Sequence, residues 1–152
     1  MDENLLRLED PEDYFKGKGN TPLPVPTNVL LFLRETKEAL QQKALQNRSH
    51  HRFVLIFNYE TEGCVHLDNQ VLRLRPGQGM LVMPYQFHHY SRLSSNDLKW
   101  LFCTFELNRG AFLEPMRNRV VNAGDKTKKS IENLLLEWRS PAQKFQAEKI
   151  QV

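Results

Sequence analysis

The stretch RLRPGQGMLVMPYQFHHYS, residues 73–91, decides the fold that the sequence predicts. Pro76–Gly77 is a turn signal, and the apolar run 80–83 that follows has the composition of a strand. Pro84 marks a second turn, after which FHHYS at 87–91 continues as another strand. Two short strands joined by a proline turn, with no helical run between them, favour antiparallel β structure.

Strand-like segments continue on both sides of this stretch. They are 52–60, 63–67, 71–75, 80–84, 87–93 and 98–107. Asp68–Asn69 between two of them suits a two-residue hairpin turn. Along 98–107 both faces are apolar, because Trp100 and Phe102 alternate with further apolar residues, so we expect this strand to be covered on both sides. The pattern predicts a mainly β fold closed into a small barrel or sandwich.

Helices are predicted on either side of these strands. Apolar residues recur at helical spacing over 28–47, which predicts an amphipathic helix. A second helix is predicted from Asp125, its candidate cap, and Ser140–Pro141 starts a third. The alternating prolines of residues 1–26 predict an extended arm that lies on the domain.

Charge and hydropathy restrict the classes of function. The net charge of +3 comes from 21 basic and 18 acidic residues that are interspersed along the chain. Such a distribution forms no concentrated basic stripe, and direct DNA binding by this chain is unsupported. No secretory signal is present, and the longest apolar run, VLLFL at 29–33, is too short to span a bilayer. We expect a cytoplasmic protein without membrane contact.

Residues 73–91 closely resemble the characteristic stretch of the AraC-type ligand-binding domain of bacterial transcription regulators. The matching residues, in order, are Pro76–Gly77, Leu81, Val82, Pro84 and His88–His89–Tyr90. Upstream, HHRFVLIFNYETEG at 50–63 looks like the opening strand of that family, and 98–107 resembles its closing aromatic strand. The resemblance implies a small cupin-like barrel, a double-stranded β-helix or jelly roll, with an N-terminal helix and C-terminal helices. The helix predicted over 28–47 departs from the family, where this region is often extended.

The resemblance also implies that three segments of the chain have different roles. Residues 1–26 would be the arm, 27–124 the ligand-binding barrel with its leading helix, and 125–152 the dimerisation helices. A helix-turn-helix DNA-binding domain is expected after residue 152 and is absent from this chain. A sugar-like effector would enter the barrel, order the arm over it and so control the position of that DNA-binding domain. We expect a homodimer and no cofactor.

Four side chains are candidates for ligand contact inside the barrel. His88 and Tyr90 share one strand face, and Trp100 and Phe102 share another. Aromatic rings stack on the C–H face of a sugar, while hydroxyl and N–H groups bond its hydroxyls. The resemblance places Tyr90, Trp100 and Phe102 at or near the pocket of the sugar-responsive members, although Trp100 and Phe102 suit plain core packing equally well. Arg48 is a further candidate, for a carboxylate.

An apolar seam in the last helices suggests how two copies pair. It consists of Leu134, Leu135, Trp138 and Phe145. Two consecutive helices offer more apolar surface than one small barrel needs, which favours a symmetric dimer. The alternative is that this stripe only covers the barrel.

Two other functions compete with the regulator. The first is a stand-alone cupin that binds a small molecule, and the second is a metal-dependent cupin enzyme. His50–His51 and His89 are the histidines available for a metal, but adjacent strand residues point to opposite faces, so at most one of the first pair faces inward. A catalytic metal needs three converging protein ligands, and we therefore predict no metal site, no catalytic residue and no enzyme. Cys64 and Cys103 are expected to be buried apolar residues.

Overall fold

The computed structural model describes residues 3–16, 18–19, 23–41 and 49–140. In chain order its elements are η1 (Glu3–Leu6), β1 (Thr27–Thr36), α1 (Lys37–Gln41), β2 (Phe53–Glu60), β3 (Gly63–Leu67), β4 (Gln70–Leu74), β5 (Gln78–Val82), β6 (His88–Ser91), β7 (Asp97–Glu106), η3 (Ala111–Met116), β8 (Val120–Asn122) and α2 (Asp125–Arg139). Within the described ranges, no helix is both long and apolar enough to cross a lipid bilayer.

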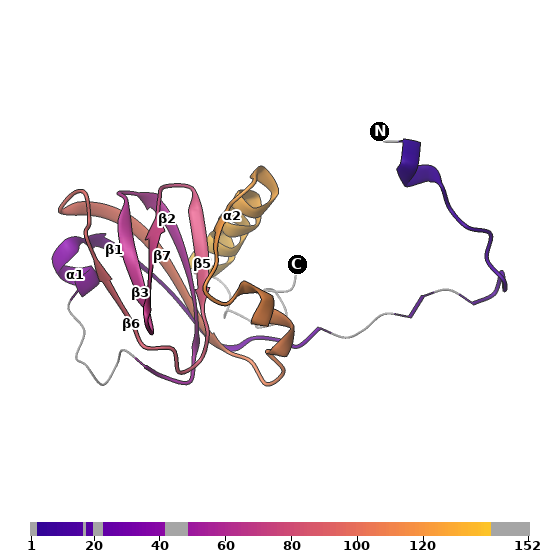
Figure 1. Ribbon diagram of the computed structural model, residues 1–152, viewed down its shortest axis with the longest axis horizontal. Helices are drawn as coiled ribbons and strands as arrows, with labels where there is room; N and C mark the ends of the chain where they lie inside the picture. Colours follow the sequence, from indigo (N-terminus) through magenta and orange to yellow (C-terminus); the bar gives the residue numbers. More distant parts are fainter. Residues whose placement is uncertain (1–2, 17, 20–22, 42–48, 141–152) are drawn as a thin grey trace.

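The strands form two antiparallel sheets (Figure 1), and buried apolar side chains from both sheets fill the space between them. The large sheet has the order β1-β7-β2-β5-β8 and the small sheet the order β4-β3-β6. The chain crosses between the sheets after β2, β4, β5 and β6. This repeated exchange is the connectivity of a jelly roll, the architecture that cupins use. The predicted mainly β, cupin-like barrel is therefore confirmed.

The strands expected between residues 52 and 107 all form, as β2 to β7. The hairpin turn between β3 and β4 lies at Asp68–Asn69, and Asp68 has the positive φ of 51° that such a turn requires. The three-residue strand β8, which pairs with β5, had no recognisable signal in the sequence.

The prediction of a helix over 28–47 is wrong, because residues 27–36 form the edge strand β1. β1 pairs with β7, and Leu31 lies opposite Cys103. Leu31 belongs to the cluster under α2, whereas Phe32 packs against the barrel interior. A continuous apolar run is compatible with a strand buried on both faces as well as with a helix. This segment forms a strand because it pairs with the free edge of β7. Only α1 is helical here, and residues 42–47 lie outside the described ranges.

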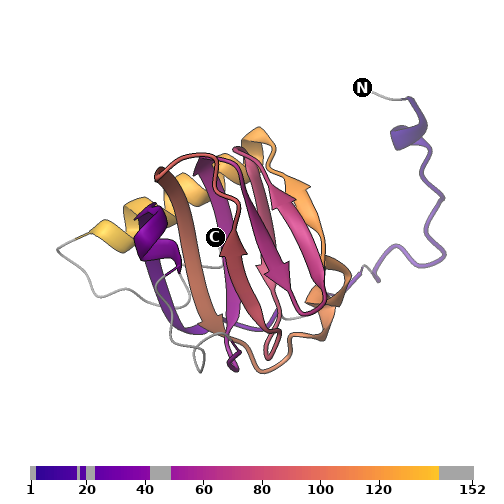
Figure 2. The ribbon, with the colours of Figure 1, turned by 60° about the vertical axis from the view of Figure 1, so that its left-hand side comes forward.

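Helix α2 lies across the outer face of the large sheet (Figure 2). The side chains that join α2 to this face are Ile131, Leu134, Leu135 and Trp138 from the helix and Leu31, Phe57, Leu101 and Cys103 from the sheet. β7 is thus covered on both sides, as predicted. The expectation that Asp125 caps the helix is wrong: Asp125 is the first helical residue and Gly124 occupies the cap position. The Asp125 carboxylate lies in the first turn, at the positive end of the helix dipole, and stabilises the helix there. The predicted third helix, from Ser140–Pro141 on, falls outside the described residues.

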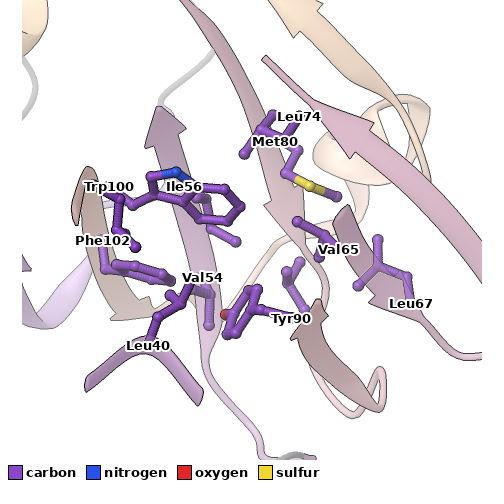
Figure 3. Packing of buried hydrophobic residues seen from close by; sticks show 12 residues of the cluster. Leu40, Val54, Ile56, Val65, Leu67, Leu74, Met80, Tyr90, Trp100 and Phe102 are labelled. Atoms are coloured by element: carbon purple, nitrogen blue, oxygen red, sulfur yellow. The ribbon is translucent and has the colours of Figure 1, made fainter. Parts of the chain in front are cut away.

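The barrel interior is a close-packed apolar cluster (Figure 3). Its buried members are Leu40, Val54, Ile56, Val65, Leu67, Leu74, Met80, Val82, Tyr90, Leu98, Trp100 and Phe102. They come from both sheets and from α1, so this one cluster holds the two sheets together.

The described residues 3–16 of the N-terminal arm extend away from the barrel (Figure 1). Their larger apolar side chains, such as Leu8 and Phe15, are exposed. In this structure the arm therefore does not lie on the domain along these residues.

Candidate functional site

The four side chains predicted to contact a ligand lie together inside the barrel. β6 supplies His88 and Tyr90, β7 supplies Trp100 and Phe102, and all four are buried. The Tyr90 ring meets the other two aromatic rings edge-on, with centroids 5.9 Å from Trp100 and 5.8 Å from Phe102. The His88 ring is 6.2 Å from the Tyr90 ring. Strand alternation thus brings the sequence-predicted residues to one place.

Trp100 and Phe102 have the surroundings of core residues. Trp100 is 0% exposed, and its Nε1 donates a 3.0 Å hydrogen bond to the backbone carbonyl of Thr61. Phe102 stacks on Phe32 with ring centroids 5.1 Å apart. Because both residues use their polar and aromatic surfaces within the protein, the structure supports the packing alternative for these two.

Tyr90 differs from them, because its hydroxyl has no hydrogen-bond partner among the described residues. The side chain is only 6% exposed. Burial raises the pKa of the phenol well above its ordinary value, and the charge of Arg34 offsets only part of that effect. The hydroxyl therefore stays protonated. An unpaired buried polar group costs about 1–3 kcal/mol, which a ligand atom bonded to this hydroxyl would recover.

A polar cluster lies beyond His88, where β2 begins. The His88 Nδ1 lies 3.1 Å from the carbonyl oxygen of Gln86, and its ring meets the His50 ring edge-on at 5.3 Å. Arg52 donates from Nε and from a terminal nitrogen to the Thr104 hydroxyl, at 3.2 and 2.9 Å. Arg52 also donates to the carbonyl of Asn28. This end of the barrel therefore gathers a guanidinium, two imidazoles and a hydroxyl.

Helix α1 bridges the two sheets beside this site. It follows β1 at the edge of the large sheet and contacts β6 at the edge of the small one. Leu40 is the buried residue of α1 and packs into the interior cluster with Tyr90. Gln41 donates from Nε2 to the backbone carbonyl of Tyr90 at 3.1 Å. A short helix with one apolar anchor thus covers the region of the Tyr90 hydroxyl.

Sequence reasoning missed one cation at this site. Arg34 lies on β1 with its guanidinium carbon 4.4 Å from the centroid of the Phe32 ring, a cation–π contact. The apolar spacing predicts a helix over 28–47, on which Arg34 would not share a face with Phe32. In the strand, residues 32 and 34 lie on the same, inner face. Arg48, the arginine predicted from the sequence, lies outside the described residues.

The histidines considered as metal ligands lie apart. His51 is exposed and its Nε2 lies 2.6 Å from Glu106 Oε1, while His50 contacts His88. Neither histidine lies in a strand, because β2 begins at Phe53. His89 lies on the outer face of the small sheet and stacks on His66 at 4.1 Å. Within the ranges that the structure describes, no group of three or more His, Cys, Asp or Glu side chains could hold a metal ion.

The His51–Glu106 pair gives a prediction about pH. The hydrogen bond from His51 is the main cause that lowers the pKa of Glu106; Asn28 and Arg52 lower it further, against an opposing effect of burial. We expect His51→Ala to raise this pKa toward its ordinary value, as measured by NMR titration of the side-chain carboxyl carbon. Since a lowered folded-state pKa contributes stability above the unfolded value of about 4.3 and loses it as pH falls, the variant should be less sensitive to acid there.

Glu114 is the matched control for this measurement. Its pKa is also lowered, by a hydrogen bond from Arg117, and that pair is independent of His51. His51→Ala should leave the pKa of Glu114 unchanged. A Glu106 pKa that does not move would contradict the assigned cause.

The residues of the predicted dimer seam cover the barrel in this structure. Leu134, Leu135 and Trp138 pack on the outer face of the large sheet, which is the intramolecular alternative. Phe145 lies outside the described residues. Pairing through this seam stays a prediction.

Both cysteines are buried free thiols, as predicted. Cys103 lies on the outer face of β7 beneath α2. Burial raises the pKa of its thiol to about 11, against an opposing effect of Arg52. Because the thiolate is the reactive form, this cysteine has little nucleophilicity at neutral pH.

No family model matches this chain, and no curated protein matches it. One similar solved structure is a cupin 2 domain-containing protein from Halorhodospira halophila, 13% identical, with a TM-score of 0.37, covering 88% of this chain and 94% of its own.

Proposed function

We propose that this chain is a small-molecule-binding domain whose ligand lies in the barrel against the Tyr90 hydroxyl. The observation that carries the proposal is this buried hydroxyl, which lacks a hydrogen-bond partner among the described residues. Around it lie the Phe102 ring and, on β1, Phe32 and the cation of Arg34. Rings with nearby hydrogen-bonding groups suit a sugar-like molecule.

In this proposal the ligand enters where α1 covers the interior. Leu40 packs directly into the cluster that contains Tyr90, so it must move to admit a ligand. Exposing a leucine side chain costs about 1.5–3 kcal/mol. The hydrogen bond gained by Tyr90 and the contacts with the neighbouring rings would offset that cost.

The more specific part of the proposal is a regulatory role. The resemblance of residues 73–91 to AraC-type sensing domains supports a symmetric dimer that carries a helix-turn-helix domain after residue 152. Ligand binding would then order the arm, residues 1–26, over the barrel and shift the positions open to that domain. Reading the coding sequence downstream of codon 152 tests this part, because a continuation without helix-turn-helix patterns would contradict it.

We further propose that the site binds its ligand without converting it. Arg34, Arg52 and the protonated Tyr90 phenol can hold hydroxyl or carboxylate groups, and we assign the neighbouring His50 and His88 imidazoles to binding as well. Mass spectrometry of ligand recovered after long incubation with the protein should find it unchanged.

Tyr90→Phe is the direct test of the site. A thermal-shift screen of monosaccharides and sugar acids should find a class that raises the melting temperature of the unaltered protein, by about 5–10 °C at hundredfold excess over Kd. Tyr90→Phe should lose most of this rise, since it lacks only the hydroxyl. A sugar that stabilises both proteins equally would place the ligand elsewhere.

The same variant needs controls for folding and for position. Without ligand, Tyr90→Phe should match the stability of the unaltered protein or exceed it by about 1 kcal/mol, because the hydroxyl it removes is unpaired. Tyr59→Phe makes the same chemical change at a half-exposed tyrosine on the other side of the sheet and should keep the ligand response.

A further inference from the structure

A second cavity lies outside the barrel, between α2 and the outer face of the large sheet. Its volume is about 240 Å³. The sheet contributes Leu31, Leu101 and Cys103, the helix contributes Ile131 and Leu134, and η3 contributes Met116. Figure 2 shows how α2 runs across the back of the sheet at this place. β7 separates the cavity from the Tyr90 site, because Leu101 and Cys103 point outward while Trp100 and Phe102 point inward.

The wall of this cavity is almost entirely apolar and carries no charge. The Cys103 thiol is neutral at ordinary pH, since burial raises its pKa to about 11. The amide of Asn122, a polar group in the wall, already accepts a 2.9 Å hydrogen bond from Gln78. A charged molecule would lose its hydration here without gaining a partner, so the chemistry selects an uncharged apolar ligand.

The size of the cavity suits a ring-sized ligand. An engineered apolar cavity of about 150 Å³ binds benzene, and this cavity is larger. No residue of α2 is fully buried, although four of its apolar side chains pack on the sheet. The helix therefore rests on the sheet without filling the space beneath it.

We propose that α2 and the large sheet form a binding site for a small, uncharged, apolar molecule, of the class of a monocyclic aromatic compound. This site is independent of the sugar-like ligand proposed for the barrel, and neither requires the other. The wall residues Ile131 and Leu134 join it directly to the helix that leads toward the end of the chain.

Ethylbenzene is the probe, with benzoate as its charged counterpart of nearly the same size. At tenfold excess over its Kd, ethylbenzene should raise the melting temperature by about 3–5 °C, and benzoate should not. Leu134→Phe fills the cavity and should abolish the response. Leu136→Phe is the matched control, because Leu136 lies two positions on and is 68% exposed; it should keep the response. The proposal fails if the unaltered protein does not respond or if Leu134→Phe responds as strongly.

Cys103 gives a readout at the site itself. At tenfold excess over Kd, ethylbenzene should slow alkylation of Cys103 by N-ethylmaleimide about tenfold, since about one molecule in eleven remains unliganded. Leu134→Phe, which fills the cavity, is the control for this readout. Ethylbenzene should not slow the alkylation of Cys103 in that variant, and slowing equal to that in the unaltered protein would overturn the assigned site.

The chain's own residues 141–152 are the competing occupant. In the full chain, Phe145→Ser removes the largest apolar side chain of that segment. If ethylbenzene binds this variant but not the unaltered protein, the segment itself fills the cavity and the proposal is wrong. Equal binding to both supports the small-molecule site.

Discussion

Replacing Trp100 with alanine is expected to lower the free energy of unfolding by about 3–5 kcal/mol. The indole is 0% exposed and meets the Tyr90 ring edge-on in the centre of the barrel. A Cβ added to Gly63 would lie 2.9 Å from this ring, so the strand opposite is packed directly against it. Truncation would leave a large cavity between the two sheets, because backbone on both sides limits how far the site can collapse.

Urea unfolding followed by far-ultraviolet circular dichroism measures this loss without relying on tryptophan fluorescence. Trp100→Phe is the graded control, since it retains a ring and leaves the Thr61 carbonyl bonded to the side chain of Asn58. It should cost less than the alanine variant. If Trp100→Ala were as stable as the unaltered protein but had lost its ligand response, Trp100 would belong to a ligand pocket and not to the core.

The strands from 52 to 107 could be predicted because their composition and turn signals are local. Pro76–Gly77 and Asp68–Asn69 mark turns whatever the rest of the chain does. The two apolar faces of 98–107 likewise predicted both neighbours of β7, the interior and α2. Helix α2 has four apolar residues at helical spacing and begins within one residue of the position expected for it.

The segment 28–47 could not be assigned from local pattern. Its run VLLFL satisfies the apolar spacing of a helix and equally that of a strand buried on both faces. The segment becomes a strand because it pairs with β7, which is distant in the sequence; Leu31 lies opposite Cys103. Because the segment was predicted to be a helix, the contact between Arg34 and the Phe32 ring was not predicted, and Arg34 was missing from the predicted site.

The buried residues of the candidate site on β6 and β7 were predicted from the sequence, but their roles were not. Alternation along β6 and β7 was enough to bring Tyr90, Trp100 and Phe102 together. The sequence could not show which of them lacks a hydrogen-bond partner. In the structure the Thr61 carbonyl accepts a hydrogen bond from the Trp100 indole, whereas the Tyr90 hydroxyl has no partner among the described residues. The cavity under α2 was equally invisible, because it reflects how loosely a correctly predicted helix rests on a correctly predicted sheet.

Asn58→Asp is expected to lower the free energy of unfolding by about 3–5 kcal/mol at pH 7, the cost of an uncompensated buried charge. Asn58 is 0% exposed, and its Nδ2 donates to the carbonyls of Thr61 and Leu74, at 2.8 and 3.1 Å. The substitution keeps the shape of the side chain but turns a donor into a carboxylate oxygen that faces two carbonyl oxygens. Both burial and these dipoles disfavour the charged form, so the pKa of the new carboxyl in the folded state should be raised.

The pH dependence separates this electrostatic cost from a simple loss of packing. A raised folded-state pKa means that the protonated acid is tolerated below the unfolded value of about 3.9, and that stability falls by about 1.4 kcal/mol per pH unit between that value and the folded-state pKa. Urea unfolding at pH 4, 5.5 and 7 should therefore find the difference from the unaltered protein smallest at pH 4, where the protonated acid still has one donor fewer than the amide, and largest at pH 7. Asn122→Asp, at an exposed residue that accepts its hydrogen bond through Oδ1, should cost little at any of these values. A cost for Asn58→Asp that is independent of pH would mean that the amide N–H groups do not hold the turn between β2 and β3.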